Sequence, residues 1–231
     1  MSEVFEVDPS RPDEAVEAVA AAAHALRTGH LVVFPTDTVY GIACRPDESS
    51  ATSRLFQAKR RPAGLNLPVL AHSAEEALDL IQANDAATRL AGAFWPGPLT
   101  LVMSRAARSI DWFLGEQTRT IGVRVPDHPL SLALLERAGP LAATSANISG
   151  SPPSPDPTAL PDAFGEAVAV YILVSPGSQD PAGRSSTVVD LDGDEVRVLR
   201  EGPIDAREIA RVAEVPSGRS RTSRTNPHSV H

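Results

Sequence analysis

The sequence predicts an α/β fold built as one domain, with a twisted, mixed sheet and helices that flank it. Three observations support this prediction. Helical and strand patterns alternate along most of the chain, and a strand-rich region follows near the C-terminus. The chain has 231 residues, of which 42% are hydrophobic. A chain of this length and composition can bury one sizeable core.

The first element expected is a helix over residues 10–26. Ser10 and Asp13 have the spacing of a capping box, and an alanine-rich body with high helix propensity follows. Residues 31–34 are all apolar and include two valines, which favours a strand buried on both faces. Pro35 ends this strand because proline donates no ladder hydrogen bond.

The remaining elements follow from apolar periodicity, capping residues and turn signals. Ser49 or Ser50 is the expected cap of a second helix, and Ser73 with Glu76 forms a capping box for a third. Helices are expected at residues 50–58, 73–82, 84–94, 129–138 and 205–212, and strands at 68–71, 99–103, 120–125, 141–144, 167–174, 187–191 and 196–199. Loops are expected at 43–50, 105–118 and 151–161.

Three regions are expected along the chain: an N-terminal segment at 1–14, one domain at 15–214 and a basic tail at 215–231. The tail is rich in Ser, Thr, Arg and Pro, and it has no acidic residue from position 216 onwards. It also has no apolar pattern, so we expect it to be disordered.

Composition argues against several classes of protein. No apolar run is long enough to span a bilayer, and the acidic N-terminus lacks the pattern of a signal peptide. Cys44 is the only cysteine, and no cysteine–histidine cluster has zinc spacing. We therefore expect a cytoplasmic protein with no membrane partner. The net charge of −8 disfavours strong nonspecific binding of nucleic acid, although it is compatible with a local basic cleft.

Polar residues come directly after two of the expected strands. Thr36 and Asp37 follow the first strand, and Ser145 and Asn147 follow a later one. In open α/β sheets, ligands bind at the carboxyl ends of strands. The same residue types also favour ordinary turns. The residues alone leave both interpretations open.

Cations at two places are candidates for an anion site. Lys59, Arg60 and Arg61 end a predicted helix, where they either offset the helix dipole or bind phosphates at the rim of a cleft. The following loop, at 62–67, is expected to be flexible and able to close over a ligand. Arg124 interrupts an apolar strand pattern. A buried arginine needs either a protein carboxylate or an anionic ligand.

Seven segments resemble one known family in their order and spacing. They are PTDTVYGI at 35–42, KRRP at 59–62, FWPGPLTLV at 94–102, TIGVRVPDHP at 120–129, TSANISG at 144–150, SSTVVD at 185–190 and VLREGPI at 198–204. Together they resemble the YrdC-type threonylcarbamoyl-AMP synthases over about residues 15–204. The chain is similar to the short bacterial form of this family.

The resemblance implies a YrdC-like fold with an open concave cleft. It implies a nucleotidyltransferase that condenses L-threonine, bicarbonate or CO2, and ATP to threonylcarbamoyl-AMP and pyrophosphate, for threonylcarbamoyl-adenosine modification of tRNA. Mg²⁺ is expected to enter with ATP, with no metal ligand assigned to a protein side chain. The expected partner is a downstream tRNA threonylcarbamoyl-transferase complex, and weak binding of tRNA is left open.

The resemblance also assigns ten site residues. The catalytic ones are Lys59, Arg61 and Arg124. Contacts to L-threonine are assigned to Thr36, Arg124, Ala143 and Ser186, and contacts to ATP to Lys59, Arg61, Thr120, Ser145, Asn147 and Arg200. Asp37 stands where many members have Glu, and His72 lies near a position where some members have a threonine-contacting histidine.

Two alternatives remain. The first is a related enzyme that handles another carbamoyl-adenylate, although such enzymes usually carry this domain fused to others. The second is a non-enzymatic module that binds tRNA or double-stranded RNA. The net charge of −8 argues against tight RNA binding at physiological salt.

Overall fold

The computed structural model describes residues 2–8, 11–150, 156–175, 181–193 and 195–214. The expected cap Ser10 and the tail at 215–231, expected to be disordered, lie outside these residues.

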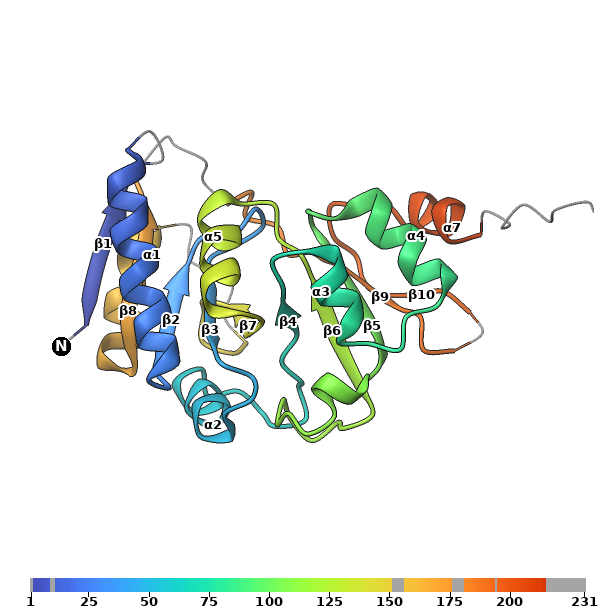
Figure 1. Cartoon of the computed structure of the whole chain (residues 1–231), viewed down its shortest axis with the longest axis horizontal. Coiled ribbons are helices and arrows are strands. Elements are labelled where there is room, and N and C mark those ends of the chain that lie inside the picture. The colour runs from blue at the N-terminus through green and yellow to red at the C-terminus, as the bar shows by residue number, and fades with distance from the viewer. Residues whose placement is uncertain (1, 9–10, 151–155, 176–180, 194, 215–231) are drawn as a thin grey trace, which may run out of the picture.

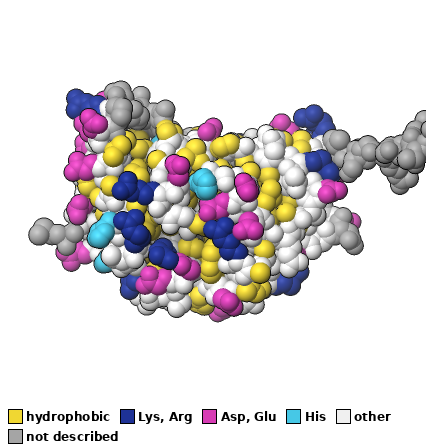
Figure 2. Space-filling model, viewed as in Figure 1, with side chains coloured by type: hydrophobic (Ala, Val, Ile, Leu, Met, Phe, Trp, Pro, Cys, Tyr) yellow, Lys and Arg dark blue, Asp and Glu magenta, His cyan; other side chains and the backbone are white. Residues whose placement is uncertain are grey.

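Seven α-helices flank the sheet in the described part of the chain (Figure 1). They are α1 (Pro12–Arg27), α2 (Ser49–Ala58), α3 (Ala74–Asp79), α4 (Asp85–Phe94), α5 (Pro129–Ala138), α6 (Leu160–Phe164) and α7 (Ala206–Ala213). All six expected helices are present, and α6 is additional. Acidic and basic side chains are interspersed over the face seen in Figure 2.

Two of the predicted helix starts are confirmed and one is wrong. Ser73 Oγ accepts a hydrogen bond from the backbone N–H of Glu76, and the side chain of Asn84 caps α4 in the same way. Helix α2 instead has Glu48 at its N-cap, without a side-chain hydrogen bond. Ser49 and Ser50 therefore lie inside the first turn of α2 instead of capping it.

Among the described residues, ten strands form one mixed sheet, which confirms the predicted fold class. They are β1 (Glu3–Val7), β2 (Leu31–Phe34), β3 (Gly41–Cys44), β4 (Val69–Leu70), β5 (Leu99–Ser104), β6 (Thr120–Arg124), β7 (Leu141–Ser145), β8 (Val168–Val174), β9 (Thr187–Asp190) and β10 (Arg197–Arg200). Their order across the sheet is β1-β8-β2-β3-β7-β4-β6-β5-β9-β10. The pairs β1–β8, β2–β8, β4–β6 and β5–β9 are parallel, and the others are antiparallel.

Two strands and one helix are absent from the sequence prediction. Strand β1 brings part of the N-terminal segment into the sheet beside β8. Strand β3 overlaps residues 43 and 44, where a loop was expected. All four of its residues are buried, so no alternation of polar and apolar residues reveals the strand. Helix α6 begins inside the loop expected at 151–161, because Leu160 and Phe164 are buried in the core.

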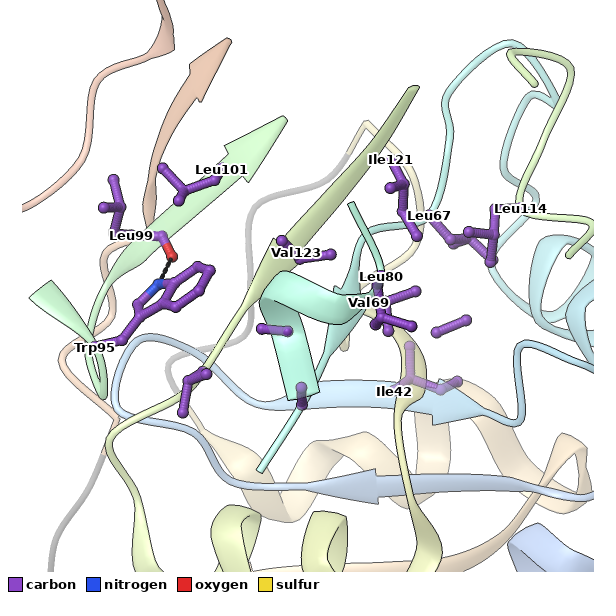
Figure 3. Packing of buried hydrophobic residues seen from close by; sticks show 14 of the residues in the cluster. Ile42, Leu67, Val69, Leu80, Trp95, Leu99, Leu101, Leu114, Ile121 and Val123 are labelled. Atoms are coloured by element: carbon purple, nitrogen blue, oxygen red, sulfur yellow. Dashed lines mark hydrogen bonds between the residues drawn. The ribbon is translucent and has the colours of Figure 1, made fainter. Parts of the chain in front are cut away.

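Each face of the sheet carries its own hydrophobic core. One core packs α1 and α5 against the end of the sheet that contains β1, β8 and β2. The other packs α2, α3, α4, α6 and α7 against the opposite face. Figure 3 shows part of this second core, including Ile42, Val123 and Leu101, and the hydrogen bond of 2.7 Å from Trp95 Nε1 to the carbonyl oxygen of Leu99.

The face that α1 and α5 cover continues across the sheet into a more polar region. Side chains alternate along each strand, and opposite residues of paired strands share a face. Leu70 in the first core is opposite Arg124, and Thr100 is opposite Val188 on the neighbouring strands. These strands therefore turn polar and small residues towards one open surface.

Candidate active site

A cavity of about 400 Å³ opens on this surface. Its walls come from the loop after β2, the segment after α2, strands β4, β5 and β6, the end of β7, and the segments around β9 and β10. Eight of the ten assigned site residues line it: Thr36, Arg61, Thr120, Arg124, Ala143, Ser145, Ser186 and Arg200. Lys59 and Asn147 do not line it.

Arg124 lies at the end of β6 and is buried, with 6% of its surface exposed. It donates from Nη2 to Asp37 Oδ1 at 2.5 Å, from Nη1 to Thr38 Oγ1 at 2.9 Å, and from Nε to the carbonyl oxygen of Gly97 at 3.0 Å. Burial lowers the pKa of Arg124, and the Asp37 carboxylate opposes this shift. Arg124 thus has a carboxylate partner and still lines the cavity.

Thr36 closes the turn that leads from β2 towards β3. Its Oγ1 donates to the carbonyl oxygen of Val39 at 2.6 Å and accepts the backbone N–H groups of Thr38 and Val39, both at 3.2 Å. The two threonine hydroxyls are 3.0 Å apart, and that of Thr38 accepts from Arg124. Thr36 therefore closes a turn and also lines the cavity, so the two interpretations of this segment do not exclude each other.

Ser186 and Arg200 form the opposite wall. Arg200 donates from Nη2 to Ser186 Oγ at 3.0 Å and from Nε to the carbonyl oxygen of Ser186 at 3.1 Å. Ser186 Oγ also lies 2.8 Å from Thr100 Oγ1. Burial lowers the pKa of Arg200. These contacts fix the direction of Arg200 while its charge faces the cavity.

Lys59 is not at a rim, which corrects the expectation from the sequence. Its side chain is fully buried, with 1% of the residue exposed. The ammonium donates to the carbonyl oxygen of Ser145 and, at 2.6 Å, to that of Asn147. A lysine at the end of an amphipathic helix is expected to be exposed. Lys59 is buried because the 145–147 turn lies against the end of α2 and offers its carbonyl oxygens to the ammonium.

Arg61 and the loop at 62–67 are held more firmly than expected. Arg61 donates from Nε to the carbonyl oxygen of Leu65 at 2.8 Å and from Nη2 to that of Asn66 at 3.0 Å. Asn66 in turn donates to the carbonyl oxygen of Gln117 at 2.6 Å and accepts its backbone N–H at 3.1 Å. The loop is therefore tied to the 114–117 segment, where a flexible loop was expected.

Several residues that line the cavity were not assigned to it from the sequence. They are Asn66, Thr100, Gln117 and Ser185. Thr38, one of the polar residues that follow the first strand, also lines it. His72 is exposed, pairs with Glu76 at 2.7 Å and does not line the cavity.

The electrostatic character of the cavity is positive. Arg61, Arg124 and Arg200 line it, and none of its described lining residues is acidic. The nearest described carboxylate partner is Asp37, which neutralises part of the charge of Arg124. Low-dielectric walls strengthen the attraction of such a cleft for anions. The site can therefore bind polyanionic ligands in an otherwise acidic protein.

The chain matches a known protein family over most of its length. The Sua5/YciO/YrdC family model, described as "Telomere recombination", matches residues 24–202. The chain belongs to the Sua5/YciO/YrdC family. The match covers every element from the last turn of α1 to the segment after β10, so the cavity lies within the family domain.

Relatives of this Sua5/YciO/YrdC chain extend over most of its length. A Mycobacterium tuberculosis protein, named provisionally as a threonylcarbamoyl-AMP synthase, is 42% identical over 92% of this chain and 95% of its own. Escherichia coli YciO aligns with a TM-score of 0.79 and 28% identity, over 90% of this chain and all of its own. Pyrococcus abyssi Sua5 in complex with L-threonine aligns with a TM-score of 0.76 and 32% identity over 92% of this chain. This chain spans 60% of the length of that Sua5.

None of the described helices has the length and apolar character needed to cross a membrane. The described residues also contain no group of three or more His, Cys, Asp or Glu side chains arranged to hold a metal ion.

Proposed function

We propose that this chain is an L-threonylcarbamoyladenylate synthase, which forms threonylcarbamoyl-AMP and pyrophosphate from L-threonine, bicarbonate or CO2, and ATP. The observation that carries the proposal is the convergence of three arginines and several hydroxyl groups on one cavity of about 400 Å³. Membership of the family, and relatives that bear the synthase name, support it.

The chemistry joins anions and needs little covalent help from the protein. The amine of L-threonine adds to CO2 and loses a proton, which gives a carbamate. A carbamate oxygen then attacks the α-phosphorus of ATP, the bond to the bridging oxygen breaks, and pyrophosphate leaves. Positioning and charge neutralisation lower such barriers most effectively. No protein nucleophile is required.

The residues of the site are proposed to bind different parts of the two substrates. Arg124 is proposed to bind the carboxylate of L-threonine, with Thr36, Ala143 and Ser186 around the amino acid. Arg61 and Arg200 are proposed to bind the ATP phosphates, with Thr120, Ser145 and Asn147 as further nucleotide contacts. Mg²⁺ would neutralise the departing pyrophosphate. Asp37 orients the Arg124 guanidinium through their ion pair of 2.5 Å.

The wider role follows from the product, a reactive mixed anhydride. We propose that a tRNA threonylcarbamoyl-transferase complex consumes it in the cytoplasm. Basic and acidic side chains are interspersed on the face seen in Figure 2, and the net charge is −8. Binding of tRNA by this chain alone is therefore expected to be weak and to fall steeply with salt.

The decisive experiment supplies the purified full chain with L-threonine, bicarbonate, ATP and Mg²⁺. Mass spectrometry is expected to detect threonylcarbamoyl-AMP, and pyrophosphate release should require all three substrates. A different carbamoyl-adenylate would favour the related-enzyme alternative. Tight tRNA binding in a filter assay without any product would favour the RNA-binding module.

The Arg124 assignment has its own test. Removing Arg124 alone would leave the partly buried Asp37 carboxylate without its cationic partner, which is destabilising. The double variant Asp37→Asn/Arg124→Gln removes both charges and should stay folded. Its KM for L-threonine is expected to rise at least about tenfold, because a charge-assisted hydrogen bond contributes about 1.5–3 kcal/mol. An unchanged threonine requirement in the folded variant contradicts the assignment.

A further inference from the structure

Lys59 is the only lysine in the chain, and arginines supply the other 20 of its 21 lysine-plus-arginine charges. It is also fully buried. Its ammonium contacts two main-chain carbonyl oxygens, those of Ser145 and Asn147. A compact ammonium with three donors can contact both oxygens at once. The one lysine of the chain is therefore placed where its ammonium contacts the main chain of another segment.

The buried charge of Lys59 has no acidic partner among the described residues. A buried cation without a carboxylate costs stability, even when carbonyl oxygens solvate it. Such a cost concentrates at functional sites more often than elsewhere. Lys59 contacts Ser145, which lines the cavity, so its burial is connected with the structure of the cavity.

Lys59 joins two walls of the cavity. Besides its ammonium contacts, its own carbonyl oxygen accepts the backbone N–H of Ser149 at 3.0 Å. Residues 145–149 are thereby tied at both ends to the C-terminus of α2. Ser145 lines one wall of the cavity, and Arg61, two residues after Lys59, lines another. The distance between these two walls depends on Lys59.

We infer that Lys59 is a positioning residue: it ties the 145–149 turn to the end of α2 and so sets Ser145 opposite Arg61, without itself touching the nucleotide. This inference rests on the proposed function for its kinetic consequences. It differs from the phosphate-clamp role that the sequence suggests for Lys59.

An acylation experiment on the wild-type chain tests the burial without any variant. Acetic anhydride or an acetyl-succinimide ester at pH 8 should modify the N-terminal amine, which serves as the internal control, and leave Lys59 unmodified with or without ATP. Because Lys59 is the only lysine, intact-mass analysis reports it directly. Rapid acetylation of Lys59 that ATP suppresses would overturn the inference in favour of a clamp. This result does not depend on turnover, so it is separable from a failure of the proposed function.

A double-mutant cycle tests the positioning role. The variants are Lys59→Met, Ser145→Ala and the two combined, measured as kcat/KM for pyrophosphate release. If Lys59 acts through the turn, Lys59→Met should lower kcat/KM at least about tenfold, and adding Ser145→Ala should lower it by less than about threefold more. Single effects that multiply, or a Ser145→Ala variant with wild-type kcat/KM, would overturn the inference.

The pH dependence of stability gives a third readout. Burial, and to a smaller extent the charge of Arg61, lowers the pKa of Lys59 to about 8. Between this value and the ordinary lysine pKa near 10.4, the unfolded chain binds the extra proton, so stability rises with pH. The Tm of the wild type relative to Lys59→Met should therefore increase from pH 8 to 10. A constant difference would contradict the burial of the ammonium.

Discussion

Three consecutive cations, Lys59, Arg60 and Arg61, occupy three different environments because of how α2 ends. The backbone N–H of Arg61 bonds to the carbonyl oxygen of Phe56, and that of Arg60 to Gln57, which is the hydrogen-bond pattern of a Schellman motif. Arg60 takes the left-handed position, with φ 51°. This reversal turns Lys59 into the protein and Arg61 towards the cavity.

The Schellman geometry gives a sharp comparison between neighbouring residues. Arg61→Ala is expected to lower pyrophosphate release at least about tenfold, equivalent to roughly 1.4 kcal/mol in the barrier, because it removes a cation from the cavity. Arg60→Gly should leave turnover unchanged and raise the Tm, because glycine adopts a positive φ without a steric penalty. Equal losses of activity in the two variants would remove Arg61 from the mechanism.

The environment of a side chain was predictable from the sequence where the chemistry of that side chain alone determines it. Arg124 interrupts an apolar strand, and a buried guanidinium must meet an anion, so the need for a carboxylate or an anionic ligand follows from its position. The structure shows that Asp37 is the carboxylate. The environment of Lys59 was not predictable. It depends on a contact with residues 145–147, which are about 86 positions away in the chain, and no local pattern encodes that contact.

At the scale of elements, the segment after β10 folds back onto the start of β9. Gly202 packs so closely there that a Cβ atom would lie 2.2 Å from the backbone nitrogen of Thr187. The Thr187 hydroxyl also donates to the carbonyl oxygen of Ile204 and accepts its N–H, both at 3.0 Å. This close approach holds Arg200 and Ser186 in hydrogen-bonding contact.

Gly202→Ala is therefore expected to affect both stability and activity. The methyl group must displace backbone atoms, which should lower the free energy of unfolding by about 1–3 kcal/mol and raise the KM for ATP or L-threonine. Gly92→Ala is the matched control, since a Cβ there meets nothing within 4 Å and alanine favours an exposed helix position. Thermal unfolding and steady-state kinetics of the two variants test this, and a Gly202→Ala protein with wild-type Tm contradicts the packing.

Helices and strands were predictable from the sequence where their apolar pattern differs from that of the flanking residues. All eight expected strands and six expected helices are present. Strand β3 was missed because it is buried on both faces, and β1 because a short edge strand with mostly exposed residues resembles a polar terminus.

At the scale of the whole molecule, the cavity and the N-terminal strand lie in different parts of one sheet. Strand β1 is at one edge, and β7, β4, β6, β5 and β9, which contribute to the cavity, lie beyond β3 in the sheet order. Val7 of β1 is nonetheless fully buried in the core that packs against α1. Changes at this edge should therefore lower the stability of the fold more than they lower catalytic activity.

Deleting residues 2–8 tests this separation. The loss of the buried Val7 side chain and of the β1–β8 ladder should cost at least about 1.5–3 kcal/mol and lower the Tm by several degrees, while kcat/KM of the folded fraction stays near the wild-type value. Deleting residues 215–231 is the control, since that sequence has no apolar pattern and its loss should leave both quantities unchanged. An unchanged Tm after the first deletion would show that β1 contributes nothing.

The position of β8 between β1 and β2 also orders events during translation. Strands β1 and β2 are synthesised before β8, to which both pair in parallel, and β8 ends about 140 residues after β2 and about 167 residues after β1. At about 5–20 residues per second, these are delays of roughly 7–28 s for β2 and roughly 8–33 s for β1. During these intervals β1 has no strand partner and one edge of β2 is open. Strand β1 is thus synthesised long before the strand that secures it, and its pairing depends on residues 168–174.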